Sequence, residues 1–245
     1  MFKKGNQMRL LSPWSCAAFF LWLVNPLGAD PVTAPYSLDF SQYPVGSVIP
    51  NLMNSSGFSL QSSGPVYTMQ VFRSKSNVAL QVTNLAGRDF ELSTQFSTDG
   101  QCSVGINAFA PSPSFFNEPG YSLLLGPGGL LQLTGADTFS SIPTTVASGD
   151  LILRGHYHNG VLDLTGMLQN GPTVYSVTAT DTTPNTGQYF GLYADAVSFS
   201  GPPVSVNFSH ITIVPEPTSA FSLIVLSAPF LRRRPHHFKP SRFLR

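Results

Sequence analysis

The chain has 245 residues, of which only 10% are charged, and it contains 21 glycines, 21 prolines and 19 phenylalanines. This composition favours turns and aromatic-rich strands over helices, and the length favours one globular domain with terminal appendages. The basic residues gather at the two ends, so residues 30–213 hold four basic and eleven acidic residues, a balance of −7. An acidic middle excludes nucleic acid as a ligand, because phosphates demand Lys and Arg.

The N-terminus combines a basic segment, "MFKKGNQMR", with the apolar stretch "LLSPWSCAAFFLWLVNPLGA", which ends in small residues. This pattern predicts a secretory signal helix over residues 1–29, removed after Ala29. A buried helix or an uncleaved anchor is the alternative, although Pro13 and Pro26 would break a long helix. After cleavage Cys102 is the only cysteine, so neither an intrachain disulfide nor a cysteine zinc site can form.

Short β-like runs separated by turn residues fill the middle of the chain, with no sustained helical periodicity. Many short strands at nearly regular spacing predict an antiparallel sandwich or barrel. The predicted strands cover residues 36–40, 58–61, 66–72, 77–83, 90–96, 103–110, 121–125, 130–133, 151–157, 161–168, 173–179, 189–194 and 204–214.

The clearest local pattern is "LILRGHYHNGVLDLTGML", at residues 151–168. Asn159-Gly160 predicts a two-residue type I′ turn, which places His158 opposite Val161 and His156 opposite Asp163. The leucines then share one face, and the polar side chains, including Arg154, share the other. In the last run, Val204, Val206 and Phe208 alternate in one phase and Ile211 and Ile213 in the other. A β-bulge near residues 209–210 would turn both sets toward the core, and a less strict strand end is the alternative.

The segments "YSLDFSQYPVGSVIP", "LILRGHYHNGVLDLTGMLQNG", "GQYFGLYADA" and "VNFSHITIV" resemble strands of the concanavalin-like, laminin-G-like jelly rolls. The resemblance covers most of residues 36–214. It implies an all-β, antiparallel two-sheet sandwich over residues 30–213, in which the N- and C-terminal strands are neighbours. It leaves the function open, because this fold hosts lectins, hydrolases and spacers.

Catalytic patterns are scarce. Glycoside hydrolysis needs two carboxylates that flank the scissile bond, whereas the family's hydrolases carry a Glu-x-Asp-x-Glu pattern that neither Glu91 nor Glu118 begins. Asp89 and Glu91 share a strand face and are interpreted as solvated charges beside Arg88. The sequence contains no G-x-S-x-G, H-E-x-x-H or phosphate-binding Gly-Lys-Ser/Thr motif. We therefore expect a protein that is not an enzyme.

Two groups of side chains are candidates for ligand binding. Tyr189 and Tyr193 should point outward if the residues between them face the core, and exposed rings with polar neighbours suit sugars. Arg154, His156, His158 and Asp163 form a polar face that could belong to the same sheet. The two histidines with Asp163 could instead hold zinc or copper, or make only ordinary cross-strand pairs. Calcium bound by aspartate-bearing loops is a further option for this fold.

The chain ends with three elements: Val-Pro-Glu-Pro-Thr-Ser, a 13-residue apolar segment from 219 to 231, and Arg232-Arg233-Arg234. The apolar segment predicts a short C-terminal helix, shorter than a transmembrane helix, which needs about 20 residues. Together the elements resemble the PEP-CTERM sorting signal over residues 214–245, with Pro215, Glu216, Pro217 and the three arginines as its marks. Here the apolar segment contains a proline, and eleven residues follow the arginines, where the family usually stops sooner.

That resemblance implies export, recognition by an exosortase and the secretion machinery, and transient membrane association through the tail. It also implies proximity to exopolysaccharide. The sequence therefore predicts an exported, non-catalytic cell-surface or matrix protein whose sandwich binds glycan. A glycoside hydrolase or polysaccharide lyase on the same fold, or a purely structural adhesin or spacer, is the alternative.

Overall fold

The computed structural model describes residues 29–54, 59–71, 75–99, 101–114, 120–196 and 204–215. The predicted signal helix, apart from Ala29, and the predicted C-terminal apolar helix lie outside these residues. So do five of the six marks of the sorting signal, because only Pro215 is described. Within the described ranges the single helix is the short 3-10 helix η2 (Phe40–Gln42), and no helix is long and apolar enough to cross a membrane.

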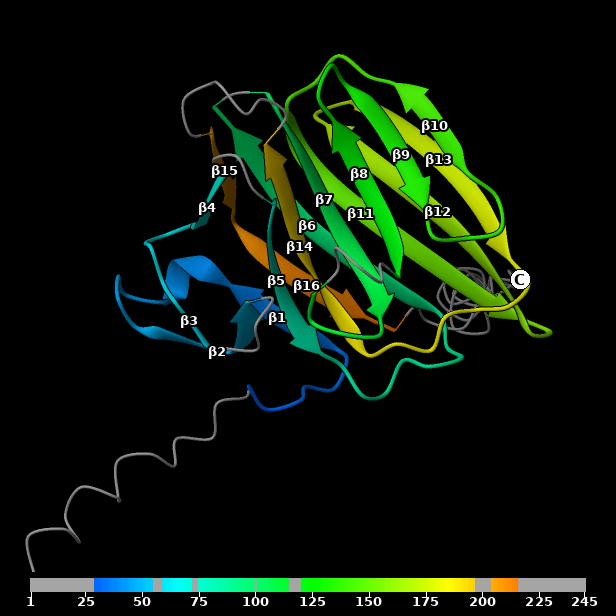
Figure 1. Ribbon diagram of the computed structural model, residues 1–245, viewed down its shortest axis with the longest axis horizontal. Coiled ribbons are helices and arrows are strands. Elements are labelled where there is room, and N and C mark those ends of the chain that lie inside the picture. The colour runs from blue at the N-terminus through cyan, green and yellow to red at the C-terminus, as the bar shows by residue number, and fades with distance from the viewer. Residues whose placement is uncertain are drawn as a thin grey trace, which may run out of the picture.

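The described residues form two antiparallel sheets that pack face to face (Figure 1). Sheet 1 follows the order β1 (Tyr36–Asp39), β16 (His210–Val214), β6 (Phe90–Thr98), β11 (Ser148–His158), β12 (Val161–Asn170) and β13 (Thr173–Asp181), with β15 (Val204–Phe208) and β4 (Tyr67–Val71) branching at β6. Sheet 2 follows β10 (Ser140–Pro143), β9 (Leu130–Thr134), β8 (Tyr121–Gly126), β7 (Cys102–Ala110), β14 (Tyr189–Ala196), β5 (Lys75–Gln81), β2 (Val48–Asn54) and β3 (Ser59–Gln61). The predicted two-sheet sandwich is confirmed.

The first and last described strands are neighbours, as expected. β1 and β16 pair with Leu38 opposite Ile211 and Ser37 opposite Thr212. Leu38 and Ile211 are buried, whereas the hydroxyls of Ser37 and Thr212 lie 3.1 Å apart on the outer face. Alternation along each strand therefore sends apolar side chains inward and polar side chains outward, as a sheet with one solvated face requires.

The β11–β12 hairpin has the predicted register, with His158 opposite Val161 and His156 opposite Asp163. Asn159 and Gly160 adopt φ angles of 50° and 82°, the left-handed values that a type I′ turn demands. Gly155 lies on the inner face of β11, where an added Cβ atom would fall 2.1 Å from the ring of Phe90. A glycine at this position lets the large ring pack directly against the strand backbone.

The predicted irregularity in the last strand is confirmed. β15 pairs Phe208 with Phe96, whereas β16 pairs Thr212 with Ser93, so four steps along the last strand match three steps along β6. Ser209 is the residue between the two strands, and its N–H donates to the Gln95 carbonyl at 3.0 Å. This bulge keeps Phe208 and Ile211 buried and redirects β15 toward β4.

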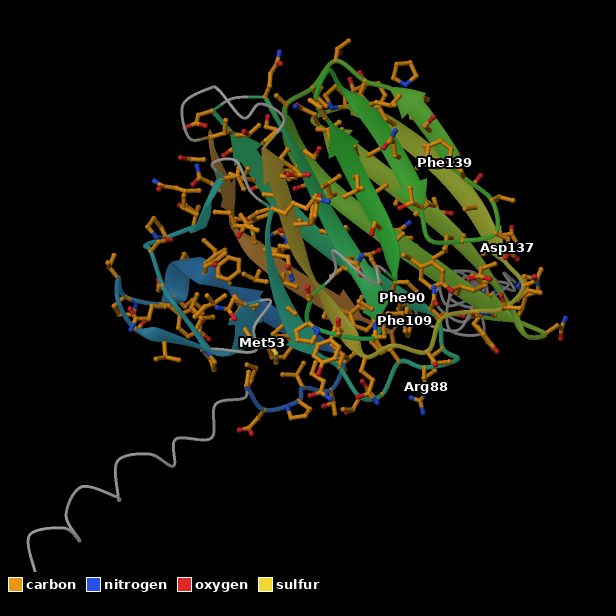
Figure 2. All side chains as sticks on the ribbon, in the orientation of Figure 1. Met53, Arg88, Phe90, Phe109, Asp137 and Phe139 are labelled. Atoms are coloured by element: carbon orange, nitrogen blue, oxygen red, sulfur yellow. The ribbon has the colours of Figure 1, made fainter. Side chains whose placement is uncertain are left out.

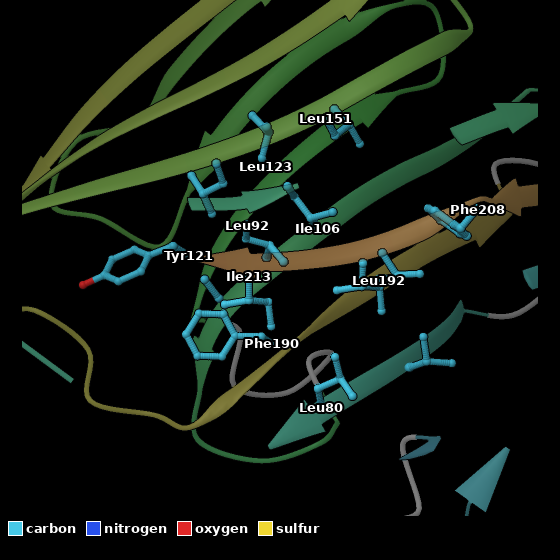
Figure 3. Packing of buried hydrophobic residues seen from close by; sticks show 14 of the residues in the cluster. Leu80, Leu92, Ile106, Tyr121, Leu123, Leu151, Phe190, Leu192, Phe208 and Ile213 are labelled. Atoms are coloured by element: carbon cyan, nitrogen blue, oxygen red, sulfur yellow. The ribbon is translucent and has the colours of Figure 1, made fainter. Parts of the chain in front are cut away.

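One continuous apolar core lies between the sheets (Figure 3). Leu92 and Leu151 of sheet 1 face Ile106 and Leu123 of sheet 2, and all four are fully buried. A cluster of aromatic rings fills one end, in which Phe90 meets Phe109 edge-on with centroids 5.1 Å apart (Figure 2). Cys102 belongs to this core as a free, buried thiol, as expected for a lone cysteine.

Two strands of sheet 2 were not predicted from the sequence. β2 carries Pro50 and no regular alternation, and β10 is a four-residue edge strand that ends in Pro143. The glycine-rich segment "GPGGL" connects β8 to β9 as a hairpin loop. Most of the other predicted strands agree with the structure to within about two residues at their ends, although β11 begins three residues earlier than expected.

Candidate functional site: a polar groove on sheet 1

A groove of roughly 370 Å³ lies at one end of sheet 1, on its outer face. This volume falls at the lower end of the range of about 300–1,000 Å³ that is usual for small-ligand sites. The lining comes from β6, β11, β12 and β15 and from the turns beside them, and most of it is polar. The lining residues are Val66, Gln95, Phe96, Ser97, Ser148, Gly149, Asp150, Gln169, Asn170, Gly171, Asn207 and Ser209.

Strand register brings the main polar side chains of the groove together. Asp150 on β11 lies opposite Gln95 of β6 on one side and opposite Gln169 of β12 on the other. Because residues opposite each other in a sheet project to the same face, these three side chains form a row across the groove. None of the described residues bonds to the Asp150 carboxylate, so it is available to a ligand.

The bulge at Ser209 supplies the second wall. β15, which ends at this bulge, pairs with both β6 and β4 and carries Asn207 beside the row. The Thr68 hydroxyl donates to the Asn207 side-chain oxygen at 2.7 Å, which fixes the plane of that amide. The bulge that the sequence predicted thus turns a flat sheet face into a hollow one.

The chemistry of the lining favours a neutral, hydroxyl-rich ligand. Amide groups of Gln95, Gln169 and Asn207 can both donate and accept hydrogen bonds, and the Asp150 carboxylate accepts only. Among the described residues, no Lys, Arg or His lines the groove, so these residues offer no cation to a phosphate or another anion. Asp150 is also the only carboxylate among the described lining residues, whereas acid–base cleavage of a glycosidic bond uses two.

Arg154 lies on the same outer face as the groove, two residues beyond Ile152 along β11. Its guanidinium Nε donates to the Glu91 carboxylate at 2.7 Å across the β6–β11 ladder. We expected Asp89 and Glu91 to be solvated charges beside Arg88. The structure instead pairs both carboxylates with side chains of β11, Glu91 with Arg154 and Asp89 with His156. Both are only partly exposed.

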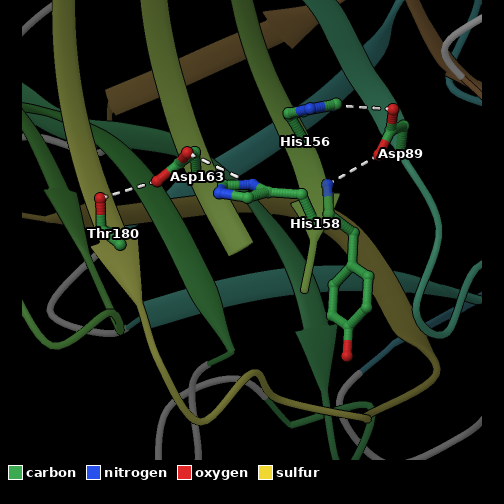
Figure 4. A network of polar contacts seen from close by, with 6 residues as sticks. Asp89, His156, His158, Asp163 and Thr180 are labelled. Carbon is green, nitrogen blue, oxygen red and sulfur yellow. Dashed lines mark hydrogen bonds and ion pairs between the residues drawn. The ribbon is translucent and has the colours of Figure 1, made fainter. Parts of the chain in front are cut away.

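The remaining polar candidates form a network at the far end of β11 (Figure 4). His156 Nδ1 lies 2.8 Å from Asp89, and His158 Nδ1 lies 3.6 Å from Asp163. Asp163 also accepts a hydrogen bond from Thr180 at 2.8 Å. His156 lies opposite Asp163 in the strand register, as predicted, but the closest partner of its imidazole is Asp89, which directly precedes β6.

Tyr189 and Tyr193 lie on β14, which belongs to sheet 2, so the structure does not bring them together with the β11 residues. The expectation of one shared sheet is wrong. Phe190 and Leu192 are buried, so the two tyrosines do point outward, yet both are half-buried rather than open. Tyr189 packs against Met53, Ala79 and Ala110.

The outer face of sheet 2 is closed around Tyr193. The Tyr193 hydroxyl donates to Asp195 at 3.1 Å, and burial together with that carboxylate raises the tyrosine pKa. Beside it Asn77 is 3% exposed and donates to the Pro113 carbonyl, so the start of the loop after β7 lies over this face. Asn107, which is 2% exposed, donates to Ser122. Sugar binding at the two tyrosines stays a prediction.

Sequence reasoning missed every side chain that forms the groove. Gln169 and Asp150 could have been paired from the Asn-Gly turn, because the hairpin register extends that far. Gln95 and Asn207 come from strands whose pairing with β11 and β6 no local pattern reveals. In the described part of the chain, no group of three or more His, Cys, Asp or Glu side chains is placed to hold a metal ion. The calcium expectation stays a prediction.

Comparison with known proteins supports the fold and leaves the family open. No protein-family model matches the chain, and no curated protein matches it significantly. Among solved structures, a native glycosidic hydrolase superposes with a TM-score of 0.50 at 12% identity, covering 78% of this chain and 100% of that one. At this identity the likeness concerns the fold alone.

Two further solved structures are also similar to the chain. The carbohydrate recognition domain of Emp47p has a TM-score of 0.49 at 16% identity, covering 77% of this chain and 99% of that one. The exoplasmic/lumenal domain of VIP36, in a form with Ca²⁺ and Man2 bound, has a TM-score of 0.45 at 15% identity, covering 77% and 92%. The antiparallel two-sheet sandwich is established by the strand pairing of the chain itself.

Proposed function

We propose that this protein is a non-catalytic glycan-binding module that holds a neutral saccharide in the groove on sheet 1. The observation that carries the proposal is the row of Gln95, Asp150 and Gln169, with Asn207 beside it, in a hollow whose described lining includes no cationic side chain. Sugar hydroxyls donate and accept hydrogen bonds, and planar amides with one carboxylate satisfy both needs.

The same groove supports binding rather than cleavage. Hydrolysis of a glycoside uses one carboxyl group as an acid and a second as a base or nucleophile, and Asp150 has no second carboxylate beside it in the lining. Asp89 and Glu91 already hold His156 and Arg154 by hydrogen bonds. Release of reducing sugar from any polysaccharide, abolished by Asp150→Ala, would overturn the non-catalytic assignment and favour the hydrolase or lyase alternative.

The termini support a place outside the cell. A basic and apolar N-terminus, a Pro-Glu-Pro tail and three arginines are the features of an exported exosortase substrate, held briefly at the membrane by its tail. An exported module with a saccharide groove would find its ligand in exopolysaccharide at the cell surface or in the matrix. If the tail is a sorting signal, the mature mass should fall when the exosortase is present. An equal mass in strains with and without the enzyme would contradict it.

Binding is tested with a glycan array followed by calorimetry on the best neutral ligand. Asp150→Ala should weaken the affinity about 10- to 100-fold, because a hydrogen bond to a charged group contributes about 1.5–3 kcal/mol. Gln169→Ala removes a second side chain of the row that lines the groove. Its matched control is Gln132→Ala on β9, because Gln132 lies on the other sheet. Equal affinity in the wild type and Asp150→Ala would rule the groove out, and absence of any glycan ligand would favour a structural spacer.

A further inference from the structure

The two histidines of β11 form a pair that the saccharide groove does not use. His156 and His158 are two residues apart on one strand face, and their rings stack with centroids 5.5 Å apart and an interplanar angle of 21°. Their side chains are 60% and 45% exposed, so both rings can turn toward an incoming ion. Figure 4 shows the two imidazoles side by side between Asp89 and Asp163.

Each imidazole turns the same nitrogen toward a carboxylate. Nδ1 of His156 lies 2.8 Å from an Asp89 oxygen, and Nδ1 of His158 lies 3.6 Å from an Asp163 oxygen. The Asp89 oxygen accepts a hydrogen bond from Nδ1 of His156 and so favours the neutral tautomer that carries its proton on Nδ1, whereas the contact between His158 and Asp163 is an ion-pair contact longer than a hydrogen bond. In that tautomer the lone pair sits on Nε2, which no described residue occupies.

Both carboxylates are themselves held in place. The second oxygen of Asp89 accepts the backbone N–H of Tyr157 at 2.7 Å, and the second oxygen of Asp163 accepts the Thr180 hydroxyl at 2.8 Å. Each aspartate thus uses one oxygen for a fixed donor and the other for an imidazole. A carboxylate behind a histidine in this way orients the ring and raises its basicity toward a metal ion.

We propose that His156 and His158 bind one divalent transition-metal ion, such as Zn²⁺, Ni²⁺ or Cu²⁺, through their Nε2 atoms. Tetrahedral zinc with bonds of about 2.0–2.1 Å places two nitrogen ligands about 3.4 Å apart, so the stacked rings must tilt toward each other. Water, or an oxygen of a third molecule, completes the coordination. With two protein ligands the site is open and exchangeable rather than structural, and Asp89 and Asp163 act as positioning residues.

Local charge supports a cation here. Asp89, Glu91 and Asp163 surround the pair with three carboxylates, whereas Arg154 supplies one positive charge, which is engaged by Glu91. The proposal does not rest on saccharide binding, since the groove lies at the other end of β11. Cross-strand pairing alone would explain why Asp89 and Asp163 lie beside the histidines. It would not explain why two stacked imidazoles each carry an Nε2 atom that is bonded to no described residue.

The test is zinc and nickel titration of the full chain by calorimetry. Because His236 and His237 of the tail could also bind metal, the background carries His236→Ala and His237→Ala. We expect one ion per chain, with affinity falling at least tenfold in His156→Gln and in His158→Gln. Asp89→Asn should weaken binding about 10- to 100-fold, the usual effect of removing such a carboxylate. His210→Gln, which alters an imidazole bonded to Ser209, is the control and should change nothing.

A second readout separates binding from folding. In spectra of ¹⁵N-labelled protein, zinc should shift the Nε2 resonances of His156 and His158 and leave those of His210 in place. Circular dichroism on each variant checks that the sandwich is intact. Stoichiometry and affinity unchanged in both histidine variants, or no binding at millimolar metal, would overturn the proposal. Zinc shifts at Nδ1 in place of Nε2 would also overturn it.

Discussion

A single hydroxyl ties the long loop before β14 to the core, and its removal should weaken the fold measurably. Tyr121 is fully buried, and its hydroxyl donates to the Asp181 carboxylate at 2.7 Å and accepts the Asn185 N–H at 2.7 Å. Burial raises the pKa of Tyr121, and the bond to Asp181 raises it further, so the phenol stays a donor at neutral pH. Tyr121→Phe keeps the ring and deletes both bonds.

The expected cost is about 2–4 kcal/mol of unfolding free energy. Asp181 is only 3% exposed, and a hydrogen bond to a charged group contributes about 1.5–3 kcal/mol. The Asn185 N–H would add a further, smaller loss when it is left without an acceptor. Asp181 retains the backbone N–H of Thr183 at 2.8 Å, which limits the damage.

Equilibrium denaturation in urea measures the change, read as a shift in midpoint at constant slope. Tyr175→Phe is the matched control, because among the described residues the Tyr175 hydroxyl bonds only to the exposed Thr145 side chain, at 3.2 Å. It should cost less than about 0.5 kcal/mol, the usual range for surface changes. If Tyr121→Phe were as mild as Tyr175→Phe, the assignment of the hydroxyl as an anchor of residues 182–188 would be refuted.

Burial raises the pKa of Tyr67 to about 12. The folded protein therefore keeps a proton that the unfolded chain releases near pH 10. The free energy of unfolding should then fall between pH 10 and pH 12 by up to about 1.4 kcal/mol per pH unit. Tyr67→Phe should flatten this decline in urea titrations, and an unchanged pH slope would contradict the shift. Gly155→Ala forces a methyl group onto the ring of Phe90 and should lower the free energy of unfolding by about 1–3 kcal/mol. Thermal melting measures this change, and an unchanged Tm would contradict the packing. Burial raises the pKa of the Cys102 thiol, so a thiol reagent should label it only in denaturant; full labelling of the folded protein would argue against its burial.

Local patterns in the sequence predicted the parts of the fold that depend on neighbours along the chain. Asn159-Gly160 determines a hairpin by itself, because the turn needs left-handed backbone angles that these residues adopt readily. The phase change between Phe208 and Ile211 revealed a bulge for a similar reason, since a strand must return its apolar side chains to one face. Edge strands such as β10 escaped because four residues carry too little periodicity.

The site required information that no single segment contains. Asp150 and Gln169 follow from the hairpin register, but Gln95 joins them only because β6 pairs with β11 after more than fifty intervening residues. The tyrosines of β14 were grouped with the β11 residues because both point outward, and outward alternation does not tell which sheet a strand joins. The ion-pair partners of the carboxylates were predicted wrongly for the same reason. Asp89 follows Arg88 in the sequence, but in the folded protein it contacts His156.

The central claim is that a neutral saccharide binds on the outer face of sheet 1, and side-chain amide resonances test it most directly. Titration of ¹⁵N-labelled protein with the array-selected oligosaccharide should shift the NH₂ signals of Gln95, Gln169 and Asn207, which line the groove. The NH₂ signals of Gln132, Asn77 and Asn107 on sheet 2 should stay unchanged. Shifts confined to the sheet 2 amides, with the groove signals unmoved at saturation, would contradict the account.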